Sequence, residues 1–327
     1  MTTYNTQGDY VLVVCPNPAV DSWIWLDEFR VQETNRITQE EHYPGGKGTH
    51  VAMALAELGH PVRLLGYWAG PTGQWIQSEV QRRYPRLRCI GPTVAGWSRH
   101  CYTVRSERET DGTEVLGVGP TLSPEAIRGF YEIFEREVQG ATSVALSGSW
   151  PRSAPDDGYA QLVRRAADHR KAVFLDCTGP ALTHALEQRP FCVHLNRPEV
   201  TQRYEVDEIT DALPQLLTNC HRAAVTDGAR GLWLADAQQT VRAQCAPDEV
   251  RSTVGSGDCL VAGLVDAFVR GEDLPMTARR GVACGAANCQ HDELGILRQE
   301  DVRFLEQRAT TEVVKAGNSA AADRNVK

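Results

Sequence analysis

Short apolar runs alternate along this chain with segments in which apolar residues recur every three or four positions. The runs are typical of strands buried on both faces, and the second pattern is typical of helices with one apolar face. The predicted strands are residues 10–15, 62–68, 143–148, 172–177, 191–196 and 223–228. The predicted helices are residues 51–59, 72–83, 123–139, 157–170, 208–219, 257–270 and 275–290. This alternation predicts an α/β fold with a mostly parallel central sheet and helices on both faces.

Two segments break this alternation. Residues 20–43 and 97–118 alternate polar and apolar positions, and the second contains Asp111-Gly112, a pair that favours a tight hairpin turn. We interpret them as a small antiparallel sheet outside the main core, which is either a lid over a site or an extra edge hairpin. Residues 308–327 lack periodicity and are predicted to form a flexible C-terminal tail.

Composition narrows the classes of protein that fit. The 327 residues are 42% hydrophobic, enough for a large core, and carry a net charge of −8. An acidic chain argues against a general nucleic-acid or membrane-surface binder, so an anionic substrate needs a local basic pocket. No apolar stretch approaches the roughly 18 residues of a membrane span, and the start MTTYNTQGDY shows no signal-peptide pattern. The ten cysteines form no C-x-x-C pair, so we expect free thiols and a cytoplasmic location.

The segment Gly255-Ser256-Gly257-Asp258 directly precedes an apolar helical run. Glycines let backbone N–H groups approach an anion closely, and a helix N-terminus adds donors and a favourable dipole. Asp258 would repel a bound phosphate unless it has a task, and accepting a hydroxyl proton during phosphoryl transfer is such a task. The alternative interpretation is an ordinary helix cap with an acid in its first turn.

Three further motifs also allow two interpretations. Gly45-Gly46-Lys47 opens a helix without matching a P-loop, and it suits either a polyhydroxyl or phosphorylated ligand or a tight connection with a solvated lysine. Asp21 follows the first strand, where open α/β sheets bind ligands, although an Asx-type turn is an equal alternative. Asn196 and Glu199 support either a hydrated Mg²⁺ or an N-capping box.

These motifs, in this order, resemble the PfkB (ribokinase-like) carbohydrate kinases, most nearly the branch of 1-phosphofructokinases and tagatose-6-phosphate kinases. The likeness covers about residues 10–305. It rests on the collinear segments CPNPAVD, GGKGTHVAMALAELG, GPTG, LSGSWP, LDCTGPAL, LNRPEV, VTDGARG and TVGSGD. The resemblance implies a single ribokinase-like kinase domain over residues 1–307 with a β lid at about 20–43 and 97–118. It also implies ATP, Mg²⁺ and a homodimer formed through the lids.

The resemblance also implies roles for individual residues. Asp258 matches the catalytic base, and Gly255, Ser256 and Gly257 match the anion hole. The substrate-binding positions it implies are Asp21, Gly45, Gly46, Lys47, His50 and Arg99, with Arg99 meeting the substrate's phosphate. It implies that ATP is bound at Thr226, Gly228 and Gly231. It links Mg²⁺ to Asn196 and Glu199. The tryptophans Trp23, Trp25, Trp68 and Trp97 are expected to pack lid against lid rather than to stack on sugar.

Some positions depart from the family pattern. His50 replaces a sugar-contacting Asn, His194 stands where a Lys is common, and Asp227 places an acid near the expected ATP phosphates. We expect ATP-dependent phosphorylation of a ketohexose monophosphate such as fructose 1-phosphate or tagatose 6-phosphate. The alternatives are a kinase for an unphosphorylated sugar or nucleoside, and a non-catalytic sugar-phosphate sensor on the same fold. No nucleic-acid or membrane partner is expected.

Overall fold

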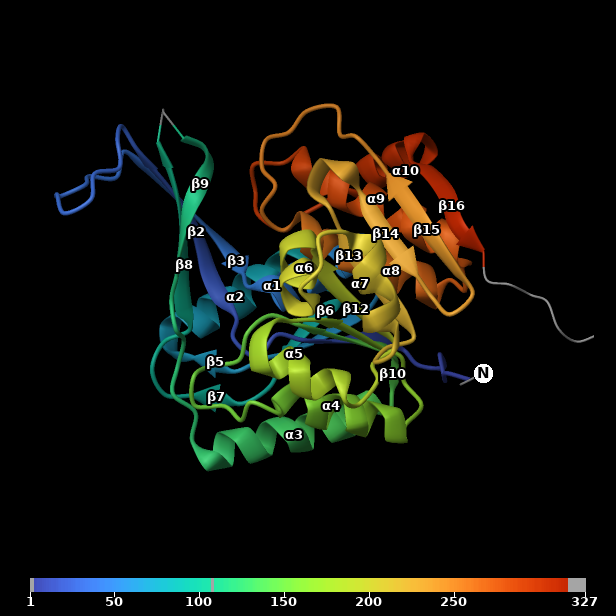
Figure 1. The fold of residues 1–327 in the computed structure, drawn as a ribbon. Coiled ribbons are helices and arrows are strands. Elements are labelled where there is room, and N and C mark those ends of the chain that lie inside the picture. The colour runs from blue at the N-terminus through green and yellow to red at the C-terminus, as the bar shows by residue number, and fades with distance from the viewer. Residues whose placement is uncertain (1–2, 107–108, 317–327) are drawn as a thin grey trace, which may run out of the picture.

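The structure is a computed structural model that describes residues 3–106 and 109–316. A ten-stranded sheet runs through it in the order β16-β15-β14-β13-β12-β11-β10-β1-β4-β6 (Figure 1). Its parallel strands are β1 (Tyr10–Val14), β4 (Val62–Leu65), β6 (Leu87–Ile90), β10 (Ala141–Ser147), β11 (Val173–Asp176), β12 (Cys192–Asn196) and β13 (Arg222–Thr226). Its antiparallel edge consists of β14 (Leu232–Ala235), β15 (Gln239–Gln244) and β16 (Thr310–Ala316). All six predicted strands are confirmed.

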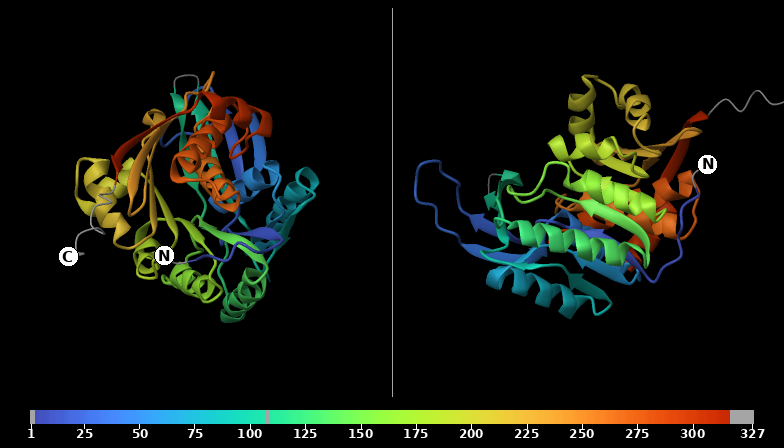
Figure 2. Two further views of the ribbon diagram at one scale, coloured as in Figure 1. Left: turned by 90° about the vertical axis from the view of Figure 1, so that its right-hand side faces the viewer. Right: turned by 90° about the horizontal axis from the view of Figure 1, so that it is seen from below.

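Helices cover both faces of this sheet, as predicted (Figure 2). Alternate residues of β1 serve the two cores: Val11 and Val13 belong to one, and Leu12 and Val14 to the other. One face is covered by α1 (Lys47–Glu57), α2 (Gly70–Arg83), α8 (Ser256–Val269), α9 (Leu274–Cys289) and α10 (Gln299–Arg308). The other face is covered by α3 (Pro124–Val138), α4 (Gly158–Asp168), α5 (Gly179–Leu186), α6 (Arg197–Tyr204) and α7 (Ile209–Leu217).

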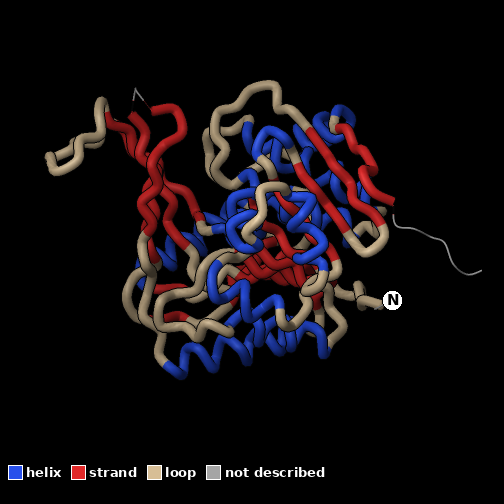
Figure 3. Tube along the Cα trace, viewed as in Figure 1, coloured by secondary structure: helices blue, strands red, loops and turns tan. Residues whose placement is uncertain are grey.

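The segments expected to form a lid build a separate sheet that stands beside the main body (Figures 1 and 3). Its order is β3 (Gln39–Gly45), β2 (Ala19–Leu26), β8 (Arg99–Ser106) and β9 (Glu109–Leu116). The outer pairings are antiparallel, and the central pairing of β2 with β8 is parallel. Two-residue strands β5 (Trp68–Ala69) and β7 (Thr93–Val94) form a third, parallel pair.

The turn predicted at Asp111-Gly112 is misplaced. Ser106 already pairs with Glu109, so Asp111 and Gly112 lie within β9, beside a shift in its register with β8. Gly112 has a φ of 69°, and a Cβ there would lie 2.8 Å from the side chain of Thr103. Gly112 therefore accommodates the register shift between β8 and β9 and does not form the turn of the hairpin.

The flexible tail predicted from residue 308 is also wrong in part. Residues Thr310–Ala316 form β16, which pairs with β15 and closes the edge of the large sheet. Backbone pairing stabilises this strand, whereas Val313 and Val314 are both nearly half exposed, so its side chains give no periodic signal. Residues 317–327 of the predicted tail lie outside the described residues. Among the described helices, none is long and apolar enough to cross a bilayer.

Candidate active site

The turn before α8 brings a helix N-terminus to the wall of a cleft. Gly255, the N-cap, has a φ of 85°, and a Cβ there would lie 2.5 Å from the backbone of Gly295. Both facts require glycine at this position. Ser256 and Gly257 follow it and line the cleft. Because the first N–H groups of a helix lack intrahelical partners, this turn can receive an anion.

Asp258 lies in the first turn of α8 and is only 6% exposed. Its Oδ2 lies 2.8 Å from Nδ1 of His50, the fourth residue of α1. Nε2 of His50 lies 3.3 Å from Oδ2 of Asp21, on β2. The structure thus brings together three predicted site residues from three separate elements.

Burial and charge shape the pKa values of this group. Burial raises the pKa of Asp258 above its ordinary value, and the contact with His50 opposes that rise. Burial also opposes protonation of His50, but its contacts with Asp21 and Asp258 outweigh this effect and raise the pKa of His50 to about 10. These contacts therefore favour the protonated form of His50.

The glycines of the second motif fit around Asp21. The backbone N–H of Gly46 donates to Oδ2 of Asp21 at 3.2 Å. A Cβ on Gly45 would lie 2.1 Å from the same carboxylate, so only glycine leaves room for it. Gly46 has a φ of 89° and forms the N-cap of α1. This connection holds a carboxylate against the start of a helix.

Lys47 follows at once and points to a different acid. Its Nζ lies 3.3 Å from Oδ1 of Asp176, a buried residue at the end of β11. Nδ1 of His194 lies 3.5 Å from the same oxygen. A Cβ at Gly257 would lie 3.4 Å from Cε1 of His194, so this histidine borders the α8 turn. His194 therefore stands beside the predicted anion hole.

Arg99 is a second cation in the cleft wall. It begins β8, and its side chain is fixed by donation from Nε to the carbonyl of Asn17 at 3.1 Å and from Nη1 to that of Gly117 at 3.4 Å. Both acceptors are backbone groups, so no carboxylate in these contacts neutralises the guanidinium. Its charge remains available to an anion in the cleft.

The predicted nucleotide loop lines the same cleft. Thr226 ends β13, Gly228 opens the short 3₁₀ helix η1 (Gly228–Arg230), and Gly231 has a φ of 88°. A Cβ on Gly231 would lie 2.0 Å from the carbonyl oxygen of Ala243, which explains the glycine.

The carboxylate of Asp227, which lies between Thr226 and Gly228, is paired with two arginines. Its Oδ2 lies 3.3 Å from Nη1 of Arg197, and its Oδ1 accepts from Nη2 of Arg230 at 2.8 Å. These pairs compensate the charge that would otherwise repel phosphates.

Asn196 and Glu199 form the N-capping box that was one of the two interpretations. Oδ1 of Asn196 accepts from the N–H of Glu199 at 2.9 Å, and Oε2 of Glu199 accepts from the N–H of Asn196 at 2.9 Å. Both residues also line the cleft. In the described part of the chain, no group of three His, Cys, Asp or Glu side chains could hold a metal ion directly.

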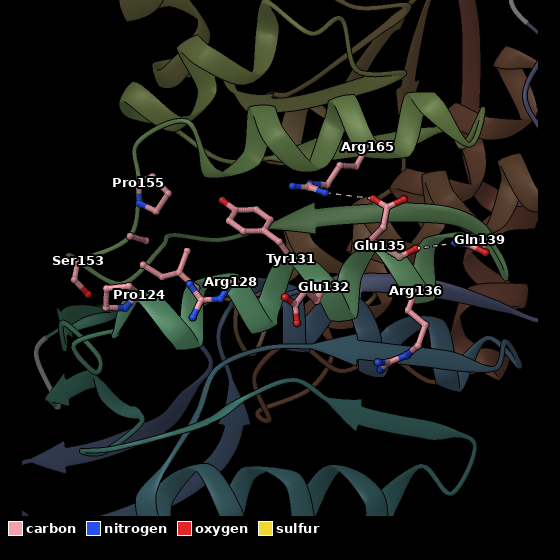
Figure 4. A pocket seen from close by; sticks show the side chains of 12 residues that line it. Pro124, Arg128, Tyr131, Glu132, Glu135, Arg136, Gln139, Ser153, Pro155 and Arg165 are labelled. Atoms are coloured by element: carbon pink, nitrogen blue, oxygen red, sulfur yellow. Dashed lines mark hydrogen bonds and ion pairs between the residues drawn. The ribbon is translucent and has the colours of Figure 1, made fainter.

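All the predicted site residues except Gly45 line one cleft of about 1080 Å³, and Gly45 packs directly beneath Asp21. A second groove of about 980 Å³ lies between α3 and α4 (Figure 4). Its floor is largely apolar, and Arg165 on its rim faces Glu135 at 3.5 Å. None of the predicted site residues lines this groove, so we place the candidate active site in the larger cleft.

Two residues of this cleft region escaped the sequence reasoning. Asp176 is the acid that Lys47 and His194 face, and its signal was a carboxylate ending a buried strand. Gly295 packs on His50, because a Cβ there would lie 2.0 Å from Cγ of the ring. The expectation that the tryptophans pack lid against lid is wrong for Trp23 and Trp68, since both are buried inside this chain.

Comparison with known proteins identifies the family of this chain. The family model described as pfkB family carbohydrate kinase matches residues 17–300. This chain therefore belongs to the pfkB family, and it is a sugar kinase: a phosphotransferase with an alcohol acceptor. Membership of a kinase family implies ATP as the phosphoryl donor.

Solved structures agree on the fold. Phosphofructokinase-2 from Escherichia coli, in complex with substrates and products, matches with a TM-score of 0.85 and 22% identity over 91% of this chain and 99% of that chain. A protein from Thermotoga maritima described as a possible 1-phosphofructokinase matches with a TM-score of 0.82 and 23% identity over 93% and 99%. Arabidopsis thaliana ribokinase, complexed with ribose and ATP, matches with a TM-score of 0.73 and 16% identity over 92% and 99%. These likenesses establish the ribokinase-like fold.

Proposed function

We propose that this kinase phosphorylates a hydroxyl of a ketohexose monophosphate, such as fructose 1-phosphate or tagatose 6-phosphate, with ATP. The observation that carries the proposal is the presence of Arg99 in the same cleft as Asp258. Arg99 is held only through backbone carbonyls in its hydrogen bonds, which leaves its positive charge for the acceptor's existing phosphate. A neutral sugar would offer no anionic group to pair with the Arg99 guanidinium.

The roles of the other residues follow from their places. Asp21 orients the sugar through a hydroxyl, and Asp258 accepts the proton of the attacking hydroxyl. The N-terminus of α8 at Gly255–Gly257 stabilises negative charge on the transferring group, and Lys47 adds a fixed cation nearby. The lid sheet covers the acceptor and excludes water. ATP lies toward Thr226, Gly228 and Gly231.

Mg²⁺ fits this site only through water. The capping box already uses Oδ1 of Asn196 and Oε2 of Glu199, which leaves Oε1 of Glu199 to accept from water molecules around an ion. Mg²⁺ usually keeps several waters, so such indirect binding suits it. When bound with ATP, the ion would neutralise phosphate charge.

An ATP-consumption assay tests the proposal. The acceptor panel contains fructose 1-phosphate, tagatose 6-phosphate, fructose 6-phosphate, fructose and a nucleoside. We expect the highest kcat/KM with a ketohexose monophosphate. Preference for fructose or a nucleoside would support the kinase for an unphosphorylated acceptor instead, and binding without turnover would support a sensor.

Arg99→Ala sharpens this test. We expect the KM for a phosphorylated acceptor to rise by about tenfold or more, because a charge-assisted contact to phosphate is lost, while a neutral acceptor is little affected. Arg128→Ala is the matched control, since Arg128 borders the groove between α3 and α4. An equal loss for charged and neutral acceptors would contradict the role of Arg99.

The lid supports a further part of the proposal, a homodimer formed through it. Val115 and Leu116 on the edge strand β9 are both more than half exposed. Apolar residues on an unpaired strand edge favour contact with a second chain. Sedimentation analysis should give the mass of a dimer, and Val115→Lys should weaken it. An unchanged dimer in that variant would place the interface elsewhere.

A further inference from the structure

His50 occupies a tightly enclosed place between two carboxylates. It is 3% exposed, and its ring is covered by the loop that carries Gly295, where a Cβ would lie 2.0 Å from Cγ. A Cβ on Gly255 would lie 3.7 Å from Nδ1, so the α8 turn borders the ring as well. The ring is therefore fixed by packing rather than free to follow a ligand.

Both ring nitrogens face carboxylate oxygens. Nδ1 lies 2.8 Å from Oδ2 of Asp258, and Nε2 lies 3.3 Å from Oδ2 of Asp21. An ionised carboxylate only accepts, so two ionised acids favour a ring with hydrogen on both nitrogens, which is a cation. The two acids are themselves almost buried, and without a cation between them one would have to be protonated.

The contacts are divided unevenly between the oxygens of each acid. Oδ2 of Asp21 also accepts from the N–H of Gly46 at 3.2 Å, so the contacts with His50 and Gly46 fall on the same oxygen. At Asp258, the contact with His50 likewise falls on Oδ2. The Oδ1 atoms remain for a ligand in the cleft that both residues line.

We propose that His50 is a positioning residue that, as an imidazolium, fixes Asp21 and Asp258 through their Oδ2 atoms and leaves both Oδ1 atoms to two hydroxyls of the acceptor. The proposal rests on the kinase function proposed above and narrows its acceptor. Because Nδ1 contacts Asp258 and Nε2 is buried against Asp21, the ring makes no hydrogen bond to the sugar. The acceptor must therefore present two hydroxyl donors, one reacting at Asp258 and one held at Asp21.

The charged groups facing this unit come from several elements. Asp21 comes from β2, Asp258 from α8, Lys47 from α1 and Asp176 from β11, and the last two form their own pair. The thiol of Cys101 on β8 lies beside Asp21, and burial raises the pKa of this thiol to about 11. At Gly295, the covering loop presents no charged side chain to the ring. His50 is thus the cation that directly contacts both acids.

The pH dependence of kcat/KM tests the proposal. In His50→Asn and His50→Gln, Asp258 loses its cation while burial still raises the pKa of Asp258. The acidic limb of the kcat/KM profile should therefore move to higher pH by about one unit or more. His60→Gln is the control, because His60 also contacts an aspartate of α8, Asp266 at 2.6 Å, outside the cleft. Its limb should not move. An unmoved limb in both His50 variants, with folding confirmed by circular dichroism, would overturn the proposal.

A second measurement does not depend on activity. The ring carbon resonance of His50, followed by NMR without substrates, should remain that of an imidazolium up to at least pH 8.5, and Asp258→Asn should lower its midpoint. Titration of His50 near pH 6.5 in the unmodified protein would overturn the proposal. If no acceptor is phosphorylated but His50 stays protonated, the kinase function proposed above fails while the ionic unit stands.

The acceptor requirement has its own readout. Asp21→Asn should raise KM much more than it lowers kcat, because it loses a holding contact, whereas Asp258→Asn should lower kcat. In the unmodified protein, a ketohexose phosphate that lacks the hydroxyl next to the reacting one should bind more weakly than the complete substrate. In Asp21→Asn, removing that hydroxyl should weaken binding only a little. Equal losses in both proteins would contradict the two-hydroxyl acceptor.

Discussion

The ammonium group of Lys47 lies 3.3 Å from Oδ1 of Asp176, a carboxylate that is 1% exposed. Burial would raise the pKa of Asp176, but Lys47 and His194 overcome this effect and hold that pKa well below its usual range. In turn, Asp176 raises the pKa of Lys47 above its ordinary value, against the effect of burial. Both groups therefore stay charged, and the start of α1 is anchored to the end of β11 beside the turn that precedes α8.

Lys47→Met should lower kcat/KM by about 10²-fold or more. The variant removes a cation from the transferring group and leaves the negative charge of Asp176 near it, so the transition state loses electrostatic stabilisation. Steady-state kinetics with ATP and the best acceptor measures this loss. Lys47→Arg keeps the charge and should recover part of the rate, and equal rates in the two variants would contradict an electrostatic role.

Asp258→Asn should lower kcat by about 10²- to 10⁴-fold, the usual contribution of a general base. The amide cannot accept a proton from the attacking hydroxyl, although it can still accept a hydrogen bond. Acceptor affinity, measured by titration calorimetry, should change by only a few-fold. Turnover close to that of the unmodified protein would rule out Asp258 as the base.

Much of the fold, and the glycine turns of the candidate site, could be predicted from the sequence because the information is local. Apolar runs marked the buried strands, and glycine-rich turns marked Gly45-Gly46 and Gly255-Ser256-Gly257, where backbone conformation or close approach needs glycine. The short helix α5 and the edge strands β14–β16 were missed, since few residues and one-sided burial leave a weak pattern.

The remaining features depend on contacts between distant segments. His50 and Asp258 are 208 residues apart, and their own surroundings in the sequence do not show that they meet. The packing of Gly295 on His50 is invisible for the same reason, because its neighbours resemble an ordinary loop. The choice between a solvated and a paired Lys47 also required the position of Asp176.

Trp23→Phe should loosen the lid. Nε1 of Trp23 on β2 donates to the carbonyl of Asp292 at 2.9 Å, which ties the lid to the loop that covers His50. Phenylalanine keeps a ring for the guanidinium of Arg105, which lies 3.7 Å above the Trp23 ring, but it lacks the donor. We expect more ATP hydrolysis relative to transfer, because a looser lid admits water. Trp97→Phe is the control, since Trp97 is 62% exposed. Equal ratios of hydrolysis to transfer in Trp23→Phe and Trp97→Phe would show that the hydrogen bond from Trp23 to Asp292 does not hold the lid closed.

Asp266→Asn should reduce the free energy of unfolding by about 3–5 kcal/mol. Asp266 is fully buried in α8, and its carboxylate contacts His60 at 2.6 Å, Arg280 at 2.6 Å and Arg270 at 3.0 Å. Arg280 is also buried, so the variant leaves a cation with less compensation. Urea unfolding measures the loss. Asp248→Asn breaks an exposed pair with Arg308 and should cost less than about 1 kcal/mol.

The same variant should show a defined pH dependence. Burial raises the pKa of Asp266, but its contacts with His60 and the two arginines outweigh this and lower it. A lowered folded-state pKa contributes stability that is fully present above the unfolded-state value of about 3.9 and is lost as the pH falls toward the folded-state value. The difference between the unmodified protein and Asp266→Asn should therefore be constant from pH 5 to 7 and shrink below pH 4. A difference that persists undiminished at pH 3 would show that Asp266 contributes through packing rather than through its charge.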